Sequence, residues 1–177
     1  MEPVRIPVRN PLSRRLSIEE VPWDAPDARL LRDLQRAEIA ERYGRPDSEP
    51  GTPPSAKDIA VFVLAREARE PDVGPSRGAP VGCAGLRDLG DGTGELKRMY
   101  VAPDRRGSGV APLLLTALEE WARGRGWTHL RLETGLSQPD AVRFYTRSGY
   151  RPIPNFGAYE GLDRSLCFER ELREPLH

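Results

Sequence analysis

Apolar residues recur along this chain with two spacings, and each spacing predicts one kind of secondary structure. Residues 59–65 form a nearly continuous apolar run rich in β-branched side chains, which is typical of a strand buried on both faces. From Val110 to Trp121 the apolar residues return every three or four positions, which indicates an amphipathic helix. Other alternating or apolar stretches predict further strands, over residues 16–21, 80–89, 95–101, 130–134 and 165–172.

Two more helices are predicted from helical spacing. One lies within residues 24–43 and ends at Gly44, because glycine readily adopts the left-handed conformation that follows a helix. The other covers residues 141–148 and ends at Gly149 for the same reason. The stretch Ser137-x-x-Asp140 before it has the form of a capping box, with Asp in place of Glu.

The order of these elements predicts the fold class. The three consecutive strands before residue 102 are linked by turns, which favours an antiparallel meander. The strand–helix–strand passage over residues 95–134 predicts a right-handed crossover and therefore one parallel pair. We predict an α+β fold, with a mixed and mostly antiparallel central sheet flanked by helices, in one domain over residues 16–177. Residues 1–15 contain prolines and no periodicity, so we expect a mobile or loosely docked N-terminal arm.

The charge balance argues against several classes of protein. The chain has 27 basic and 27 acidic residues and a formal net charge of zero, whereas a general nucleic-acid or membrane-surface binder would show a basic excess. No apolar run is long enough to span a bilayer, and the charged, proline-interrupted start does not resemble a signal peptide. We expect a soluble, cytoplasmic protein with no nucleic-acid or membrane partner.

The cysteines and histidines argue against a metal site. Cys83 and Cys167 lie far apart in apolar, strand-like surroundings, so we expect buried thiols of a reducing compartment rather than a disulfide. The two histidines, His129 and His177, have no metal-ligand spacing to each other or to the cysteines. We therefore expect no metal cofactor.

A glycine-rich turn joins the strand that ends at Val101 to the helix that starts at Val110. Backbone N–H groups in the first turn of a helix lack internal partners, and the helix dipole adds partial positive charge there. Because Gly107 and Gly109 have no Cβ, a phosphate can approach this backbone closely. The P-loop signature would need a lysine after Gly109, and the Rossmann signature would need a small residue where Pro112 stands, so both signatures fail.

Two motifs resemble those of the GNAT N-acetyltransferases. The first is similar to the family's acetyl-CoA motif Arg/Gln-x-x-Gly-x-Gly/Ala, in the stretch Val101-x-Pro103-x-x-Arg106-Gly107-x-Gly109-x-Ala111. The second resembles the family's Ala-x-x-Phe/Leu-Tyr-x-x-x-Gly-Phe/Tyr, in the stretch Ala141-x-x-Phe144-Tyr145-x-x-x-Gly149-Tyr150. The resemblance covers about residues 58–172 and departs from the family where Gln138 replaces a frequent asparagine.

The resemblance implies a GNAT fold and an acetyl-CoA-dependent N-acetyltransferase. In that family the Met99 N–H would bond the thioester oxygen, the Val101 backbone would pair with the pantetheine arm, and residues 106–111 would hold the pyrophosphate. The residues it implies for the coenzyme are Met99, Val101, Arg106, Gly107, Ser108, Gly109, Val110, Ala111 and Gln138.

Acetyl transfer to an amine needs a base for the ammonium and an acid for the leaving thiolate. The resemblance implies Glu95 as the base and Tyr145 as the acid. Each has a plainer interpretation, a solvent-facing carboxylate at a strand end for Glu95 and a core aromatic for Tyr145. The acceptor is expected near four residues, Arg42, Tyr43, Phe156 and Tyr159.

Several interpretations of the function stay open from the residues alone. We expect direct transfer of an acetyl group to the amine of a small molecule, such as an amino acid. A GNAT-fold acyl-CoA sensor or scaffold without transferase activity is the alternative from a different class, and a protein or peptide N-acetyltransferase is another. The sequence does not exclude an acyl donor longer than acetyl-CoA. A homodimer is suggested by the family resemblance alone.

Overall fold

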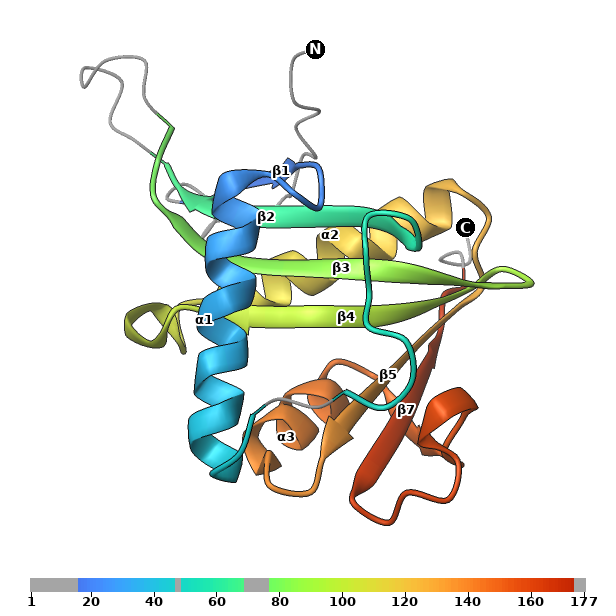
Figure 1. The fold of residues 1–177 in the computed structure, drawn as a ribbon. Helices are drawn as coiled ribbons and strands as arrows, with labels where there is room; N and C mark the ends of the chain where they lie inside the picture. The colour runs from blue at the N-terminus through green and yellow to red at the C-terminus, as the bar shows by residue number, and fades with distance from the viewer. Residues whose placement is uncertain (1–15, 47–48, 69–76, 174–177) are drawn as a thin grey trace.

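The computed structural model describes residues 16–46, 49–68 and 77–173 and contains one mixed sheet (Figure 1). Its seven strands stand in the order β1-β2-β3-β4-β5-β7-β6, and only the β4–β5 pair is parallel. The strands are β1 (Leu16–Glu20), β2 (Ile59–Glu67), β3 (Pro80–Gly90), β4 (Thr93–Val101), β5 (His129–Gly135), β6 (Arg151–Ile153) and β7 (Ser165–Glu171). The N-terminal arm expected over residues 1–15 lies outside the described residues.

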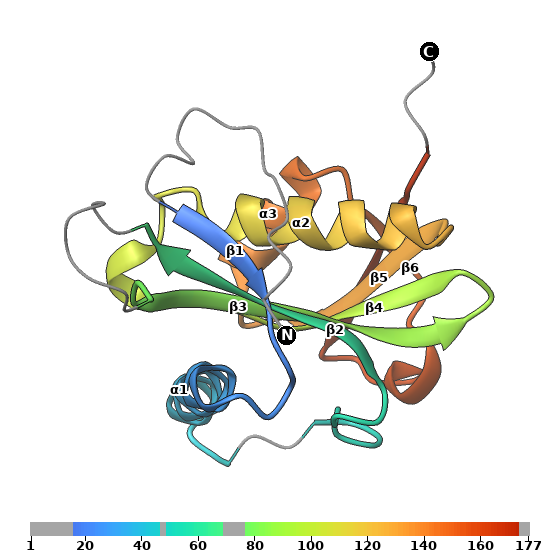
Figure 2. The same ribbon diagram turned by 90° about the horizontal axis from the view of Figure 1, so that it is seen from above.

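Three helices cover the two faces of the sheet. Seen from above, α1 lies on one face, and α2 and α3 lie on the other (Figure 2). The helices are α1 (Pro26–Tyr43), α2 (Val110–Gly124) and α3 (Pro139–Arg147), with short 3₁₀ turns η2 (Pro103–Arg105) and η3 (Gly157–Tyr159). This arrangement confirms the α+β fold with a single parallel pair, and it adds the short strand β6, which the sequence prediction missed.

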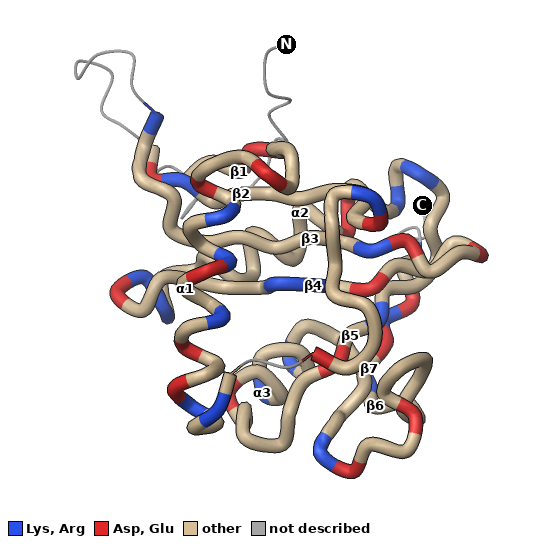
Figure 3. The backbone as a smooth tube through the Cα atoms, viewed as in Figure 1, with Lys and Arg blue, Asp and Glu red and all other residues tan. Residues whose placement is uncertain are grey.

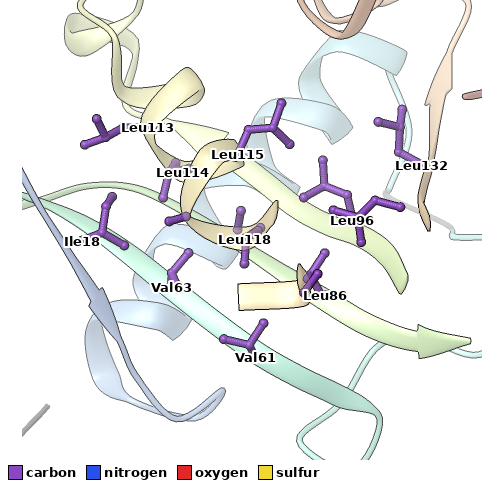
Figure 4. Packing of buried hydrophobic residues seen from close by; sticks show 14 of the residues in the cluster. Ile18, Val61, Val63, Leu86, Leu96, Leu113, Leu114, Leu115, Leu118 and Leu132 are labelled. Atoms are coloured by element: carbon purple, nitrogen blue, oxygen red, sulfur yellow. The ribbon is translucent and has the colours of Figure 1, made fainter. Parts of the chain in front are cut away.

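The larger core lies between α2 and the sheet. Leucines from one side of α2 pack against β2, β3 and β4, and Leu114 and Leu118 are fully buried (Figure 4). The helical spacing that predicted α2 therefore marks a true buried face. A smaller cluster under α1 contains Leu31 and Phe62, so both faces of β2 are buried, as its continuous apolar run predicted.

The helix ends agree only partly with the sequence signals. Gly44 follows α1 with a φ of 65°, in the left-handed conformation expected of it. The predicted capping box before α3 is wrong, because Gln138 is the N-cap and makes no side-chain cap. Pro139 holds the first helical position, so the N-cap falls at Gln138, one residue after the Ser137 that the motif would have used.

The parallel pair opens into a wedge. β4 and β5 pair at only three positions, from Thr93 with His129 to Glu95 with Arg131. Beyond them β5 turns away from β4 (Figure 1). A bulge lies in the open part of β4, where Arg98 adopts a φ of 58° and the pairing with β3 shifts register. These two irregularities produce a strand edge with unpaired backbone groups.

Both cysteines are free and buried, as predicted. Within the residues that the structure describes, no helix is long and apolar enough to cross a membrane.

Candidate active site

A cleft of about 1180 Å³ occupies the wedge between β4 and β5. Its walls come from the C-terminal half of α1, the open part of β4, the glycine turn, the end of β5, α3 and the segment that leads into β7. The cleft contains most of the residues that the sequence singled out. Those that line it are Arg42, Tyr43, Glu95, Met99, Val101, Arg106, Gly107, Ser108, Gly109, Val110, Ala111, Gln138, Tyr145 and Tyr159.

The open edge of β4 points two backbone N–H groups into the cleft. The Ala102 N–H donates to the Val81 carbonyl at 2.8 Å, so by the alternation of a strand the Val101 N–H points away from β3. The Arg98 carbonyl accepts a hydrogen bond from the Cys83 thiol at 3.3 Å, on the β3 side. Because a trans peptide places its C=O and N–H on opposite sides, the Met99 N–H points into the cleft.

Side chains hold the carbonyls on the same edge. Gln35 of α1 donates from Nε2 to the Met99 carbonyl at 2.9 Å. Arg106 donates from Nε to the Val101 carbonyl at 3.0 Å and pairs with Glu38 at 2.6 Å. Burial raises the pKa of the Cys83 thiol to about 12, so this side chain keeps the proton that it donates. The carbonyls of the bulge are therefore held by side chains from β3, α1 and the glycine turn.

The glycine turn leaves donors exposed at the start of α2. Gly107 and Gly109 have φ values of 78° and 90°, and a Cβ built on either would meet no atom within 4 Å. The open space beside both glycines allows a ligand to lie against the backbone. In the described part of the chain no hydrogen bond uses the N–H groups of residues 107–111, which are the donors that a pyrophosphate would need.

Tyr145 reaches the cleft from α3. Its ring is 7% exposed and packs against Phe144 and Tyr150, with ring centroids 5.0 and 5.8 Å away. Tyr145 lines the cleft. Its hydroxyl makes no hydrogen bond within the described residues, so it is available to a ligand in the cleft. Burial raises the pKa of the Tyr145 phenol above its ordinary value, so the group stays protonated at neutral pH.

Glu95 is buried rather than solvent-facing, with an exposure of 3%. Its Oε1 accepts a hydrogen bond from the Tyr159 hydroxyl at 2.6 Å and lies 3.4 Å from the Lys97 ammonium. Lys97 also contacts the Tyr159 oxygen at 3.1 Å and pairs with Glu49. Burial and the neighbouring Glu95 raise the pKa of Tyr159, which therefore remains a donor. The role of Glu95 as a base stays a prediction.

Sequence reasoning missed Glu133, which stands across the cleft on β5. Burial raises the pKa of its carboxyl, an effect that a hydrogen bond with Ser165 and the charge of Lys97 reduce and that Glu49 and Glu95 increase. The alternation of β5 offered a signal, because Leu130 and Leu132 are buried against the core and Glu133 therefore faces the other side.

The four residues expected near the acceptor do not all reach the cleft. Tyr43 lies against β5, since its hydroxyl would be 2.3 Å from a Cβ on Gly135, and it also approaches Gln138 at 3.4 Å. Arg42 lines the cleft and pairs with Glu38 at 3.5 Å. Phe156 is not part of the lining; it packs edge-on against the ring of Tyr159 at 5.3 Å.

Charge is concentrated where the cleft meets β4. The middle of β4 carries a basic segment (Figure 3), formed by Lys97 and Arg98, and Glu49 pairs with both. Among the described residues, no group of three or more His, Cys, Asp or Glu side chains could hold a metal ion.

The comparisons with known proteins agree with this geometry. Residues 29–150 match the profile of the acetyltransferase (GNAT) family. An IAA acetyltransferase of Azospirillum brasilense is 38% identical over 118 residues, which cover 66% of this chain and 71% of that protein.

Two solved structures share the fold. A Klebsiella pneumoniae protein, provisionally named an acyl-CoA N-acyltransferase, has a TM-score of 0.71 and 29% identity over 89% of this chain and 98% of its own. The PaiA N-acetyltransferase of Thermoplasma acidophilum, solved in complex with coenzyme A, has a TM-score of 0.50 and 17% identity over 78% of this chain and 69% of its own. From the profile match and these likenesses, the chain belongs to the GNAT family of acetyltransferases.

Proposed function

We propose that this protein transfers the acetyl group of acetyl-CoA directly to the amine of a small molecule. One observation carries the proposal. The free edge of β4, with the Met99 and Val101 N–H groups turned into the cleft, leads straight to the glycine turn and the start of α2. A strand-like arm followed by a pyrophosphate fits such a surface, because the edge offers strand pairing and the turn offers anion binding.

One side of the cleft would bind the coenzyme, and the other side would bind the acceptor amine. Acetyl-CoA supplies an activated acetyl thioester when it is bound. The N–H groups of residues 107–111 and the Arg106 side chain would hold its pyrophosphate, and Gln138 would lie beside the arm. The Met99 N–H would stabilise negative charge that develops on the thioester oxygen, a contribution that such donors make in a water-poor site.

Proton transfers complete the proposed reaction. Tyr145, protonated at neutral pH, would give its proton to the departing thiolate. A carboxylate of the cleft would act as the base, and the family resemblance implies Glu95 for this role. Tyr159 would act through Glu95, to which it donates.

The small-molecule acceptor rests on one relative and on the shape of the site. The Azospirillum relative is named for IAA, a small molecule. In this chain Tyr43, Tyr159 and the segment before β7 stand around the acceptor end of the cleft. We expect the acceptor to enter there, with Arg42 near the rim.

A thiol-release assay tests the proposal. The protein is incubated with acetyl-CoA and with a panel of small amines, amino acids and peptides. We expect thiol release that depends on both the acetyl donor and a small amine. Acetyl-CoA binding without amine-dependent release would favour a sensor or scaffold, and release with peptides alone would favour a protein N-acetyltransferase. Replacing acetyl-CoA by longer acyl-CoA donors identifies the preferred acyl group.

A further inference from the structure

Glu133 lies beside a network of charged side chains at the buried end of the cleft. The network has three acids and three bases, and four of its members line the cleft while Arg87 and Asp58 lie outside the lining. Its pairs are Arg98–Glu49 at 2.7 Å, Arg87–Asp58 at 2.7 Å, Lys97–Glu95 at 3.4 Å, Arg87–Glu95 at 3.9 Å and Lys97–Glu49. Their formal charges cancel. Glu133 lies beside this network and adds a negative charge to it.

Glu133 faces the same side of the sheet as Glu95. In the parallel pair Glu95 stands opposite Arg131, and side chains two residues apart on a strand share a face, so Glu133 continues that face beyond the last paired position. It lines the cleft. Within the described residues no Lys, Arg or His nitrogen lies within ion-pair distance of its carboxylate, which has a hydrogen bond with Ser165.

Both oxygens of Glu95 already contact neighbouring donors or cations. Its Oε1 already accepts the Tyr159 hydroxyl hydrogen and faces the Lys97 ammonium, and its Oε2 faces Arg87. A proton arriving on Oε1 would displace the Tyr159 donor and leave Lys97 with less negative charge to balance it. Both oxygens of Glu95 therefore already have partners, whereas among the described residues no cation lies within ion-pair distance of the Glu133 carboxylate.

We propose that Glu133 binds the acceptor as an ammonium ion and takes its proton. The preferred substrates are then amines that carry a positive charge in solution. The inference rests on the proposed acetyl transfer and deepens it. Glu95, Tyr159 and Lys97 contact one another and would form the wall of the cleft beside the reacting nitrogen.

The proposed step balances within the site. An N–H bond of the ammonium breaks, and the proton goes to a Glu133 oxygen. The nitrogen lone pair then forms the bond to the thioester carbon, the carbon–sulfur bond breaks, and the thiolate takes the proton of Tyr145. The nitrogen loses its second proton as the amide forms, and that proton restores the Tyr145 hydroxyl. The carboxyl proton returns to solvent through the mouth of the cleft before the next turnover.

Charged and titratable groups from four segments of the chain surround the Glu133 carboxyl. Glu95 and Lys97 lie on β4, Glu49 precedes β2, Tyr159 lies in η3 and Cys167 on β7. Burial is the largest effect and raises the pKa of Glu133, which brings its carboxyl nearer to the neutral pH at which a base accepts protons from amines most effectively. An ammonium ion beside it would compensate the burial of its charge.

The substitution Glu133→Gln tests the proposal by two independent measurements. Glutamine keeps the shape and can still accept from Ser165, but it can neither neutralise an ammonium nor take its proton. The matched control is Glu120→Gln, on the exposed side of α2.

The first measurement compares two acceptors. One is the most active amine of the panel, and the other is its analogue with fluorine atoms beside the nitrogen, which is mainly neutral at neutral pH. We expect Glu133→Gln to lower kcat/KM by about 10²- to 10⁴-fold for the cationic amine and far less for the neutral analogue. Equal losses with both acceptors, or no loss, would overturn the assignment. A wild-type protein inactive toward every amine would instead count against the proposed function.

The second measurement needs no acceptor. Because the folded-state pKa of Glu133 is raised, ionising this group costs the folded protein stability as the pH rises through and above the ordinary carboxyl pKa of about 4.3. Glu133→Gln should therefore unfold at a higher temperature than the wild type at neutral pH, and this advantage should vanish below about pH 4. A variant that is less stable at neutral pH would make Glu133 a structural residue and overturn the inference.

Discussion

Replacing Tyr145 by phenylalanine separates chemistry from packing in this site. The ring of Tyr145 packs between Phe144 and Tyr150, and phenylalanine keeps those contacts. The hydroxyl makes no hydrogen bond within the described residues, so its removal strands no partner. We therefore expect the free energy of unfolding to change by less than about 0.5 kcal/mol.

The expected effect on the reaction is much larger. A general acid contributes about 10²- to 10⁴-fold to a rate, which corresponds to about 2.7–5.4 kcal/mol of barrier at 1.36 kcal/mol for each factor of ten. Coenzyme A is a fairly good leaving group as a thiolate, so we expect Tyr145→Phe to lower turnover by about 100-fold. Because this interaction forms only as the thiolate leaves, kcat and kcat/KM should fall together.

Tyr150→Phe is the matched control, since it removes the same atom from the neighbouring ring. The Tyr150 hydroxyl donates to the buried carboxylate of Glu119 at 3.1 Å. Losing it should cost about 1–3 kcal/mol of stability, or about 3–9 °C in Tm, with little effect on kcat. Thiol release, coenzyme affinity and thermal unfolding are measured for both variants. Full activity in Tyr145→Phe would refute its role as the acid.

Four further perturbations have distinct expected outcomes. Gly109→Val places a β-branched residue at a φ of 90° and fills the space beside the turn, so coenzyme affinity measured by calorimetry should fall sharply; unchanged affinity would contradict binding at this turn. Glu95→Gln should lower turnover while the acidic limb of the pH–rate profile persists, and loss of that limb would make Glu95 the base. Cys83→Ala should lower kcat at unchanged coenzyme affinity, and Cys83→Ser should restore it, because serine keeps a donor for the Arg98 carbonyl. Glu119→Ala should destabilise the fold by about 3 kcal/mol in denaturant unfolding, at the low end for a buried pair because the Arg170 side chain is 34% exposed.

The fold was predictable where the periodicity was long. The helical spacing from Val110 and the apolar run of residues 59–65 correspond to α2 and β2, whose buried faces follow those patterns. Strand β6 was not predictable, because its three residues are too few to show alternation. The cap of α3 was misassigned because Ser137 matched the capping motif, whereas the helix begins at Pro139 with Gln138 as its N-cap.

The site was predictable where it is local in sequence. The glycine turn and the helix that follows are adjacent along the chain, so one motif specified the coenzyme side of the cleft. The acceptor side joins residues far apart in sequence, as in the hydrogen bond between Tyr159 and Glu95 across 64 positions. No local pattern encodes such a pair or the divergence of β5, both of which follow from tertiary packing.

The bulge at Arg98 was also invisible in the sequence. Arginine is an unusual residue at a φ of 58°, where glycine or asparagine is favoured. The residue type therefore gave no signal that predicted this conformation. In the structure two side chains hold this conformation, Cys83 through the Arg98 carbonyl and Gln35 through the Met99 carbonyl.

The most direct test of the central claim follows the acetyl carbon itself. The protein is incubated with acetyl-CoA labelled with ¹³C at the carbonyl carbon and with the most active amine of the panel, and the products are measured by NMR. The proposed function predicts that the label appears in an N-acetyl amide of that amine, in an amount equal to the free coenzyme A formed. Label that stays in acetyl-CoA, or that appears as acetate with the amine unchanged, would contradict direct acetyl transfer.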